Sequence, residues 1–122
     1  MRMAIAFKHL AKRPDGRTHI AGRRLTPYDM LCQYELGGTP ETLSEGYDLS
    51  LAEVYEALAY AFDHPDQMER IREDNKAADE RIIDQLPEHL REIARQTAAA
   101  DELAYQETAR NAREARRGIP VP

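Results

Sequence analysis

The sequence predicts a mostly α-helical protein in which a short N-terminal β-strand precedes a three-helix core of the helix-turn-helix kind, and two longer helices follow. Three observations predict this fold. Thr-Pro pairs and a serine mark helix starts, glycines mark helix ends, and apolar residues recur three and four positions apart. The 122 residues include no Trp and only two Phe, so we expect a small core of Leu, Ile, Val, Ala and Tyr.

The strand is expected over Thr18–Ile20, and Gly22 marks its end. We interpret it as a pairing strand that contacts a second copy of the chain. Arg23 follows the glycine, and its position predicts an exposed side chain that is free to take part in function. The next helix is capped by Thr26, with proline at its first position.

Glycines and prolines divide the following stretch into two helices. The first helix is expected to end at Gly37-Gly38, and Thr39-Pro40 repeats the start signal for a short second helix that ends near Gly46. A loop of about four residues centred on Tyr47 then leads to a third helix, which is the layout of a helix-turn-helix core.

Ser50 and Glu53 have the spacing of a capping box at the start of the third helix. Behind them, six apolar residues fall at helical spacing, and we expect them to form one buried stripe that includes Tyr55. They are Leu51, Val54, Tyr55, Leu58, Ala61 and Phe62.

Beyond residue 62 the sequence predicts two longer helices, the first starting near Pro65 and the second covering residues 87–117. The first has a short heptad seam centred on Asn75, a buried polar residue of the kind that sets the register of paired helices; a surface helix that leans on the core is the alternative. The domains expected are residues 1–62 for the strand, core and basic arm, 63–117 for a helical extension, and 118–122 for a disordered tail.

Charge is distributed unevenly along the chain. Residues 1–24 hold seven bases and one acid (+6), residues 110–122 hold four bases and one acid (+3), and the middle holds six bases and twenty acids (-14). Such segregation favours contact with nucleic acid, an acidic partner or a second copy of the chain. The candidate DNA-binding residues of the basic arm are Lys12, Arg13, Arg17, Arg23 and Arg24. For Arg24, a structural salt bridge is the alternative.

Several classes of site are not expected. The longest apolar run is far shorter than the roughly 18 residues of a membrane span, so a cytoplasmic protein without membrane contact is predicted. The four His residues and the single Cys show no metal-ligand spacing, and no phosphate-binding glycine loop is present. We therefore expect no enzyme activity, no cofactor and no metal.

The stretch GRTHIAGRRLTPYDM, with the later GGTPETLSEGYDLSLAEVYEALAYA, resembles the bacterial and archaeal family known as domain of unknown function 433, over residues 16–62. The chain departs from the family pattern at Arg23, where the family usually has Thr, and at Asp48, where many members have Pro. The matching positions are Gly16, His19, Ile20, Gly22, Arg24, Gly37, Tyr47, Leu51, Val54, Ala57, Leu58, Tyr60 and Ala61.

The resemblance implies a helix-turn-helix fold and, for several members, service as an antitoxin beside a PIN-type ribonuclease toxin. The third helix, however, would offer DNA mainly Ser50, Ala52, Glu53 and Glu56, which are poor groups for base readout. The leading hypothesis is a non-enzymatic antitoxin-like regulator that binds a toxin through its C-terminal half and DNA through the basic arm. The alternative is a homo-oligomeric structural or interaction protein that binds no DNA.

A homodimer is expected under either hypothesis, paired through the N-terminal strands or the C-terminal helices. The candidate interface residues are His19, Ile20, Met68, Ile71, Asn75, Ile82, Leu90, Leu103 and Tyr105.

Overall fold

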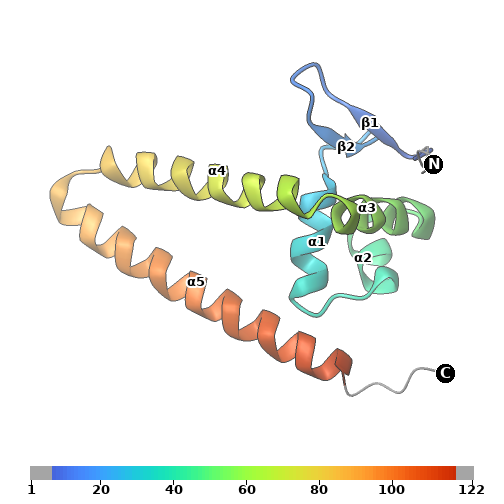
Figure 1. Cartoon of the computed structure of the whole chain (residues 1–122). Coiled ribbons are helices and arrows are strands. Elements are labelled where there is room, and N and C mark those ends of the chain that lie inside the picture. The colour runs from blue at the N-terminus through green and yellow to red at the C-terminus, as the bar shows by residue number, and fades with distance from the viewer. Residues whose placement is uncertain (1–6, 118–122) are drawn as a thin grey trace. The chain divides into compact units, whose positions relative to one another are not determined.

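The computed structural model describes residues 7–117 and confirms the predicted fold class (Figure 1). The predicted tail 118–122 and the first six residues of the basic arm lie outside the described residues. The chain divides into two compact units: residues 1–34 with 38–65, which we call the core unit, and residues 35–37 with 66–122, which we call the hairpin unit. The elements are β1 (Leu10–Lys12), β2 (Thr18–Ile20), α1 (Pro27–Glu35), α2 (Pro40–Tyr47), α3 (Leu51–Asp63), α4 (Pro65–Asp84) and α5 (Glu88–Arg117).

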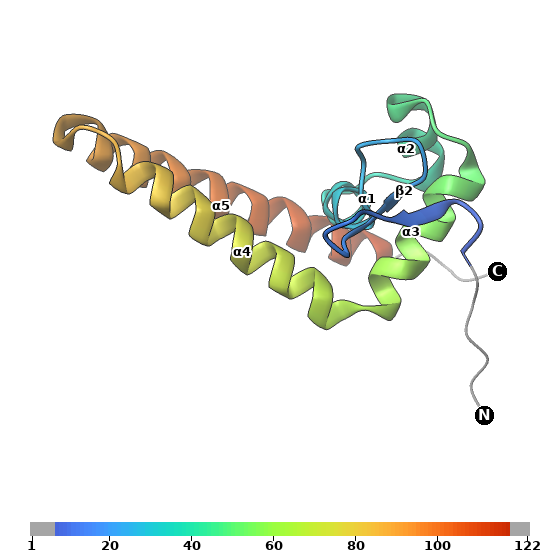
Figure 2. The ribbon, with the colours of Figure 1, turned by 90° about the horizontal axis from the view of Figure 1, so that it is seen from above.

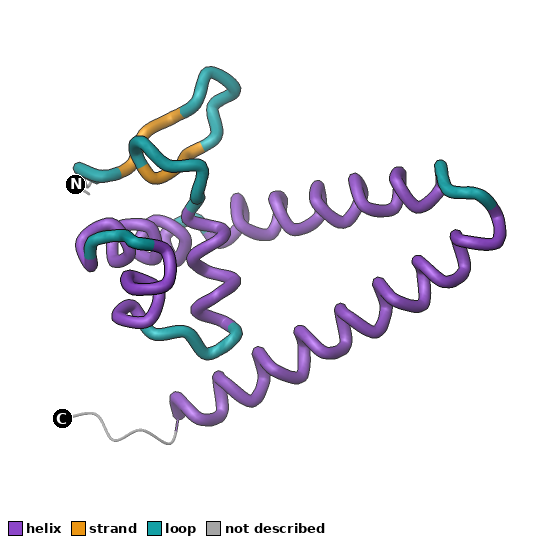
Figure 3. The backbone as a smooth tube through the Cα atoms, turned by 180° about the vertical axis from the view of Figure 1, so that it is seen from behind, coloured by secondary structure: helices purple, strands orange, loops and turns teal. Residues whose placement is uncertain are grey.

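The core unit begins with a β-hairpin that the sequence predicted only in part. β2 occupies the predicted residues, but its partner is β1 of the same chain, antiparallel and with Leu10 opposite Ile20 (Figure 3). Gly22 has a φ of 77°, a left-handed conformation that favours glycine, where the chain turns from β2 toward α1. β1 occupies one edge of β2, and the pairing between copies that we expected through this strand stays a prediction.

Each helix of the core starts where the sequence predicted, and each start is capped by reciprocal hydrogen bonds. At α1, the Thr26 hydroxyl accepts from the Asp29 N–H at 3.2 Å, and the Asp29 carboxylate accepts from the Thr26 N–H at 2.9 Å. Thr39 forms the equivalent box at α2, and Ser50 forms the predicted one with Glu53 at α3. The loop between α2 and α3 holds three residues, 48–50, since α2 continues through Tyr47.

The hydrophobic core lies between β2 and the three helices that follow it. Ile20, Met30 and Val54 have no exposed surface and so anchor one strand and two helices in a common cluster. Leu10, Leu25, Tyr34 and Tyr47 pack against its edge.

The apolar residues of α3 divide between two faces rather than forming the single predicted stripe. Val54 and Leu58, with Ala57 and Ala61, are buried. Leu51, Tyr55 and Phe62 are 44%, 52% and 59% exposed, so the expectation of a buried Tyr55 is wrong. The apolar arc of this helix is wider than the core can cover.

The hairpin unit consists mainly of α4 and α5, two antiparallel helices joined by a turn at residues 85–87 (Figures 1 and 2). Among the described residues of the two helices, only Met68 and Ala109 are buried. Asn75 is exposed in the single chain, so its expected place in a seam between paired helices stays a prediction. No described helix is long and apolar enough to cross a membrane.

Candidate functional site

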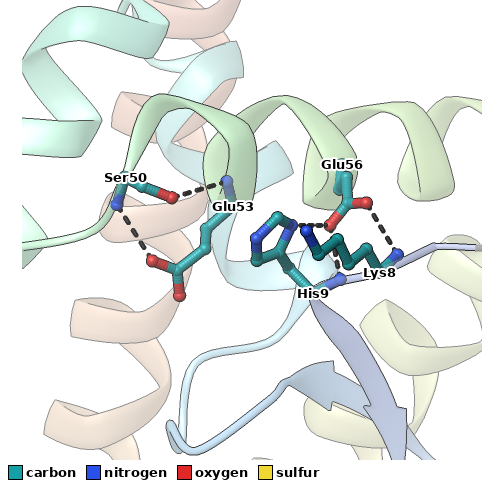
Figure 4. Close-up of polar contacts among 5 residues, drawn as sticks. All are labelled: Lys8, His9, Ser50, Glu53 and Glu56. Carbon is teal, nitrogen blue, oxygen red and sulfur yellow. Dashed lines mark hydrogen bonds and ion pairs between the residues drawn. The ribbon is translucent and has the colours of Figure 1, made fainter.

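The third helix of a helix-turn-helix core is the element that would face DNA. Two of its acids are instead used to hold the fold. Glu53 closes the cap of α3, since its carboxylate accepts from the Ser50 N–H at 3.0 Å (Figure 4). Glu56 accepts from the N–H groups of Lys8 and His9 at 2.8 and 2.7 Å, and its Oε2 lies 2.6 Å from His9 Nδ1. Glu56 thereby fastens the chain just before β1 onto α3.

These contacts change the acidity of both carboxyl groups. For Glu53, the Ser50 N–H hydrogen bond lowers the pKa despite some desolvation, and the charge of Arg23 adds to the lowering. For Glu56, desolvation raises the pKa, but hydrogen bonds from Lys8 and His9 outweigh it, so the pKa is lowered overall. Both groups are therefore ionised at neutral pH, and a negative charge close to α3 opposes DNA.

Apart from Asp63 at its last position, the exposed residues of α3 carry no charge. We call this surface the α3 face; its members are Leu51, Ala52, Tyr55, Ala59 and Phe62, all exposed. Phe62 also meets the ring of Tyr34 edge-on, with 5.6 Å between centroids. Five neighbouring exposed positions without a charged side chain are typical of a protein contact surface.

The segment that contains this face is strongly acidic. From Pro27 to Asp63, through all three core helices, the chain contains eight acids and no Lys or Arg. The acids are Asp29, Glu35, Glu41, Glu45, Asp48, Glu53, Glu56 and Asp63. The field of this segment repels nucleic acid and favours a basic partner.

Arg23 has a structural contact, in contrast to the expectation of a free side chain. Its Nη2 donates to the Asp48 carbonyl oxygen at 2.6 Å. Asp48 ends α2 in a left-handed conformation, with φ of 54°, which proline cannot adopt because its ring holds φ near -65°. The two departures from the family pattern therefore touch each other: Arg23 holds the loop that Asp48 shapes.

The remaining basic candidates lie on and after the β-hairpin. Arg13 donates to the Arg24 carbonyl oxygen at 3.1 Å, and Arg17 lies 3.9 Å from the Asp15 carboxylate at the turn. Lys12 and the Arg24 side chain are exposed, and within residues 7–117 no carboxylate forms an ion pair with Arg24. The structure thus brings Lys12, Arg13 and Arg17 together at the turn of the β-hairpin, between β1 and β2.

The expected interface residues have different environments. Ile20 is fully buried in the core, which leaves it no surface for a partner, and His19 is half-buried. In the hairpin unit, Tyr105 donates to the Glu35 carboxylate at 2.7 Å, beside Arg72, which also donates to Glu35 at 3.3 Å. Met68 is buried and Ile71 half-buried. The exposed candidates are Asn75, Ile82, Leu90 and Leu103.

Sequence reasoning missed the role of Glu56 and the α3 face. The Glu56 contacts span 47 and 48 positions in the chain, and no local spacing signals them. The α3 face did have a signal, since the apolar positions of α3 span more of the helix than one core-facing side needs.

Comparison with known proteins gives a match to a family model, which covers part of the chain. No curated protein and no solved structure matches the chain. The match covers β2 and the three core helices except the end of α3, and leaves out α4 and α5. Residues 12–61 match the model of the family described as protein of unknown function (DUF433), which confirms the resemblance stated from the sequence.

Proposed function

We propose that this chain is a non-enzymatic, antitoxin-like regulatory protein whose core unit binds a basic protein partner through the α3 face. The observation that carries the proposal is the exposed apolar face of α3. It belongs to a three-helix segment that contains eight acids and no Lys or Arg. A ribonuclease must attract RNA phosphates with basic residues. An acidic surface with an apolar centre complements such an enzyme in both charge and chemistry.

The family resemblance supports a PIN-type ribonuclease as the partner. The test uses the purified chain with the nuclease encoded in the neighbouring reading frame, and measures RNA cleavage and the dissociation constant of the complex. Tyr55→Ala with Phe62→Ala should weaken binding at least about thirty-fold, as expected for two central aromatic contacts. Ile82→Ala, an equally exposed apolar residue on α4, is the matched control and should bind normally.

The proposal is contradicted by two outcomes. One is a neighbouring nuclease whose activity the chain does not change at micromolar concentration. The other is inhibition that Tyr55→Ala with Phe62→Ala leaves intact. Raised salt should also weaken the complex, because part of the attraction is electrostatic.

A second candidate function is DNA binding by the β-hairpin. Residues 8–24 hold six bases and one acid, and Lys12 and Arg24 are exposed. A fluorescence anisotropy titration against DNA from upstream of the gene, at ~50 and ~200 mM salt, tests this function. Lys12→Ala, Arg17→Ala and Arg24→Ala together should abolish binding, whereas Arg23 is kept because it holds the Asp48 loop.

A further inference from the structure

A row of arginines lies along one side of α5 in the second half of the helix, outside the family match. Arg110, Arg113 and Arg117 are spaced three and four positions apart, which places them on one side of an α-helix. All three are exposed, and within residues 7–117 no carboxylate forms an ion pair with them. The ion pairs of this unit involve Arg72 and Arg95 instead. We call the surface of the three arginines the α5 arginine face.

Stabilisation of the helix end does not account for this row. Positive side chains are favourable near the C-terminus of a helix, but the effect fades beyond the last turn. The bases of that turn are Arg116 and Arg117, whereas Arg110 and Arg113 lie earlier in α5. Arg110 and Arg113 therefore need another explanation.

The composition of this side indicates what it contacts. From Gln106 to Arg117, it holds Gln106 and the three arginines, with no apolar or aromatic side chain. A protein contact has an apolar centre, and a single-stranded nucleic acid is held by stacking on aromatic rings. Contacts to the phosphates of a duplex need only cations and hydrogen-bond donors. Arginine is well suited to them, because its planar guanidinium donates two parallel hydrogen bonds to a phosphate.

The dimensions of the row also match a duplex. Seven positions of an α-helix span about 10 Å, and one strand of a DNA duplex carries a phosphate about every 3.4 Å along its axis. The row thus covers the length of about three phosphates. We propose that the α5 arginine face contacts the phosphate backbone of duplex DNA. This inference rests on DNA binding, the second candidate function, and adds to it a contact outside the β-hairpin.

Two acids lie at the edge of the α5 arginine face. Glu107 is three positions from Arg110, and Glu114 is four from Arg110 and three from Arg117, so both reduce the local positive charge. Residues 103–117 still hold four bases and two acids (+2). If this side meets phosphates, Glu107→Gln with Glu114→Gln should strengthen DNA binding by about two- to five-fold, because two repelling charges are removed.

The main experiment removes the arginines and measures DNA binding by fluorescence anisotropy. The probes are two labelled duplexes of ~20 base pairs, one from upstream of the gene and one of arbitrary sequence, at ~50 to ~200 mM salt. Arg110→Ala, Arg113→Ala and Arg117→Ala together should weaken binding at least about tenfold, by the same factor for both duplexes. The slope of the logarithm of affinity against the logarithm of salt concentration should fall by about 2 to 3, since three phosphate contacts are lost.

A matched control separates position from net charge. Arg70→Ala, Lys76→Ala and Arg81→Ala together remove the same three positive charges from exposed positions of α4. These residues are spaced six and five positions apart, so they do not form a row, and we expect less than about a threefold change. Alanine favours helix, and circular dichroism of each variant establishes that the helices remain formed.

Four results would overturn the inference. They are binding and a salt slope that the three α5 changes leave unaltered, an equal loss in the α4 control, weaker binding after the two Glu→Gln changes, and competition by polyglutamate that equals competition by unlabelled duplex of the same total charge. The last would assign the face to an acidic protein. A wild-type chain that binds neither duplex removes this inference together with the second candidate function, whereas binding that does not depend on the α5 arginines removes this inference alone.

Discussion

The core unit keeps Ile20, Met30 and Val54 entirely out of water, whereas α4 and α5, with 50 residues, bury only Met68 and Ala109 among those described. The core unit has an internal hydrophobic cluster that draws on a strand and three helices. The helical hairpin instead depends on helix propensity and on side-chain hydrogen bonds and ion pairs, such as those that Tyr105 and Arg72 make with Glu35. The comparison teaches that one chain can combine a part held together by burial of apolar side chains with a part that buries very little of its own surface.

The largest expected effect is in the core unit. Leu58→Ala removes a side chain that is only 5% exposed and should lower the free energy of unfolding by about 2 to 5 kcal/mol, because it leaves a cavity. Ile82→Ala, at 61% exposure on α4, should change it by less than about 0.5 kcal/mol in dilute protein. Urea unfolding measures both, and equal losses would erase the distinction between the units.

The attachment of the N-terminal segment to α3 should respond to pH. Glu56→Gln keeps the shape but loses the charge and should cost about 1 to 2 kcal/mol at pH 7. Because the folded pKa of Glu56 is lowered, its contribution is present above the ordinary Glu pKa of about 4.3 and is lost as pH falls through the folded value. The gap between wild type and variant, measured by urea unfolding at pH 7 to 3, should close on acidification. A gap that stays constant would contradict the assignment.

The cap of α3 is a smaller, local contribution. Ser50→Ala removes the acceptor for the Glu53 N–H at 3.1 Å and should destabilise the core unit by about 1 kcal/mol. Ser50→Asp preserves an acceptor at the same position and is the control, with little change expected. Thermal unfolding followed by circular dichroism measures both variants.

The smallest effect is expected in the hairpin unit. Tyr105→Phe removes the hydrogen bond to Glu35 and should cost about 0.5 to 1 kcal/mol, seen as faster amide hydrogen exchange around Tyr105 in α5. Tyr55→Phe alters an exposed hydroxyl on the α3 face and should leave exchange unchanged. If the two variants behaved alike, the Glu35 contact would have no role in holding the unit.

The starts of the helices could be predicted because their signals are local. Thr26, Thr39 and Ser50 cap within three residues of themselves, so sequence spacing suffices. β1 escaped prediction because three residues within a basic segment show no alternation of polar and apolar side chains. Tyr55 was placed on the wrong side because helical spacing identifies an apolar arc but not how much of it the core covers.

The sequence by itself determined the order of the elements, the capped helix boundaries, and the separation of an acidic body from basic ends. These properties depend on neighbours within a few positions and on counting charges. Only the tertiary structure decided that β2 pairs within the chain, that Glu56 holds residues 8 and 9, and that Arg23 supports the loop at Asp48. Those contacts join residues 6 to 48 positions apart, and which partners meet depends on how the core packs, which local patterns do not encode.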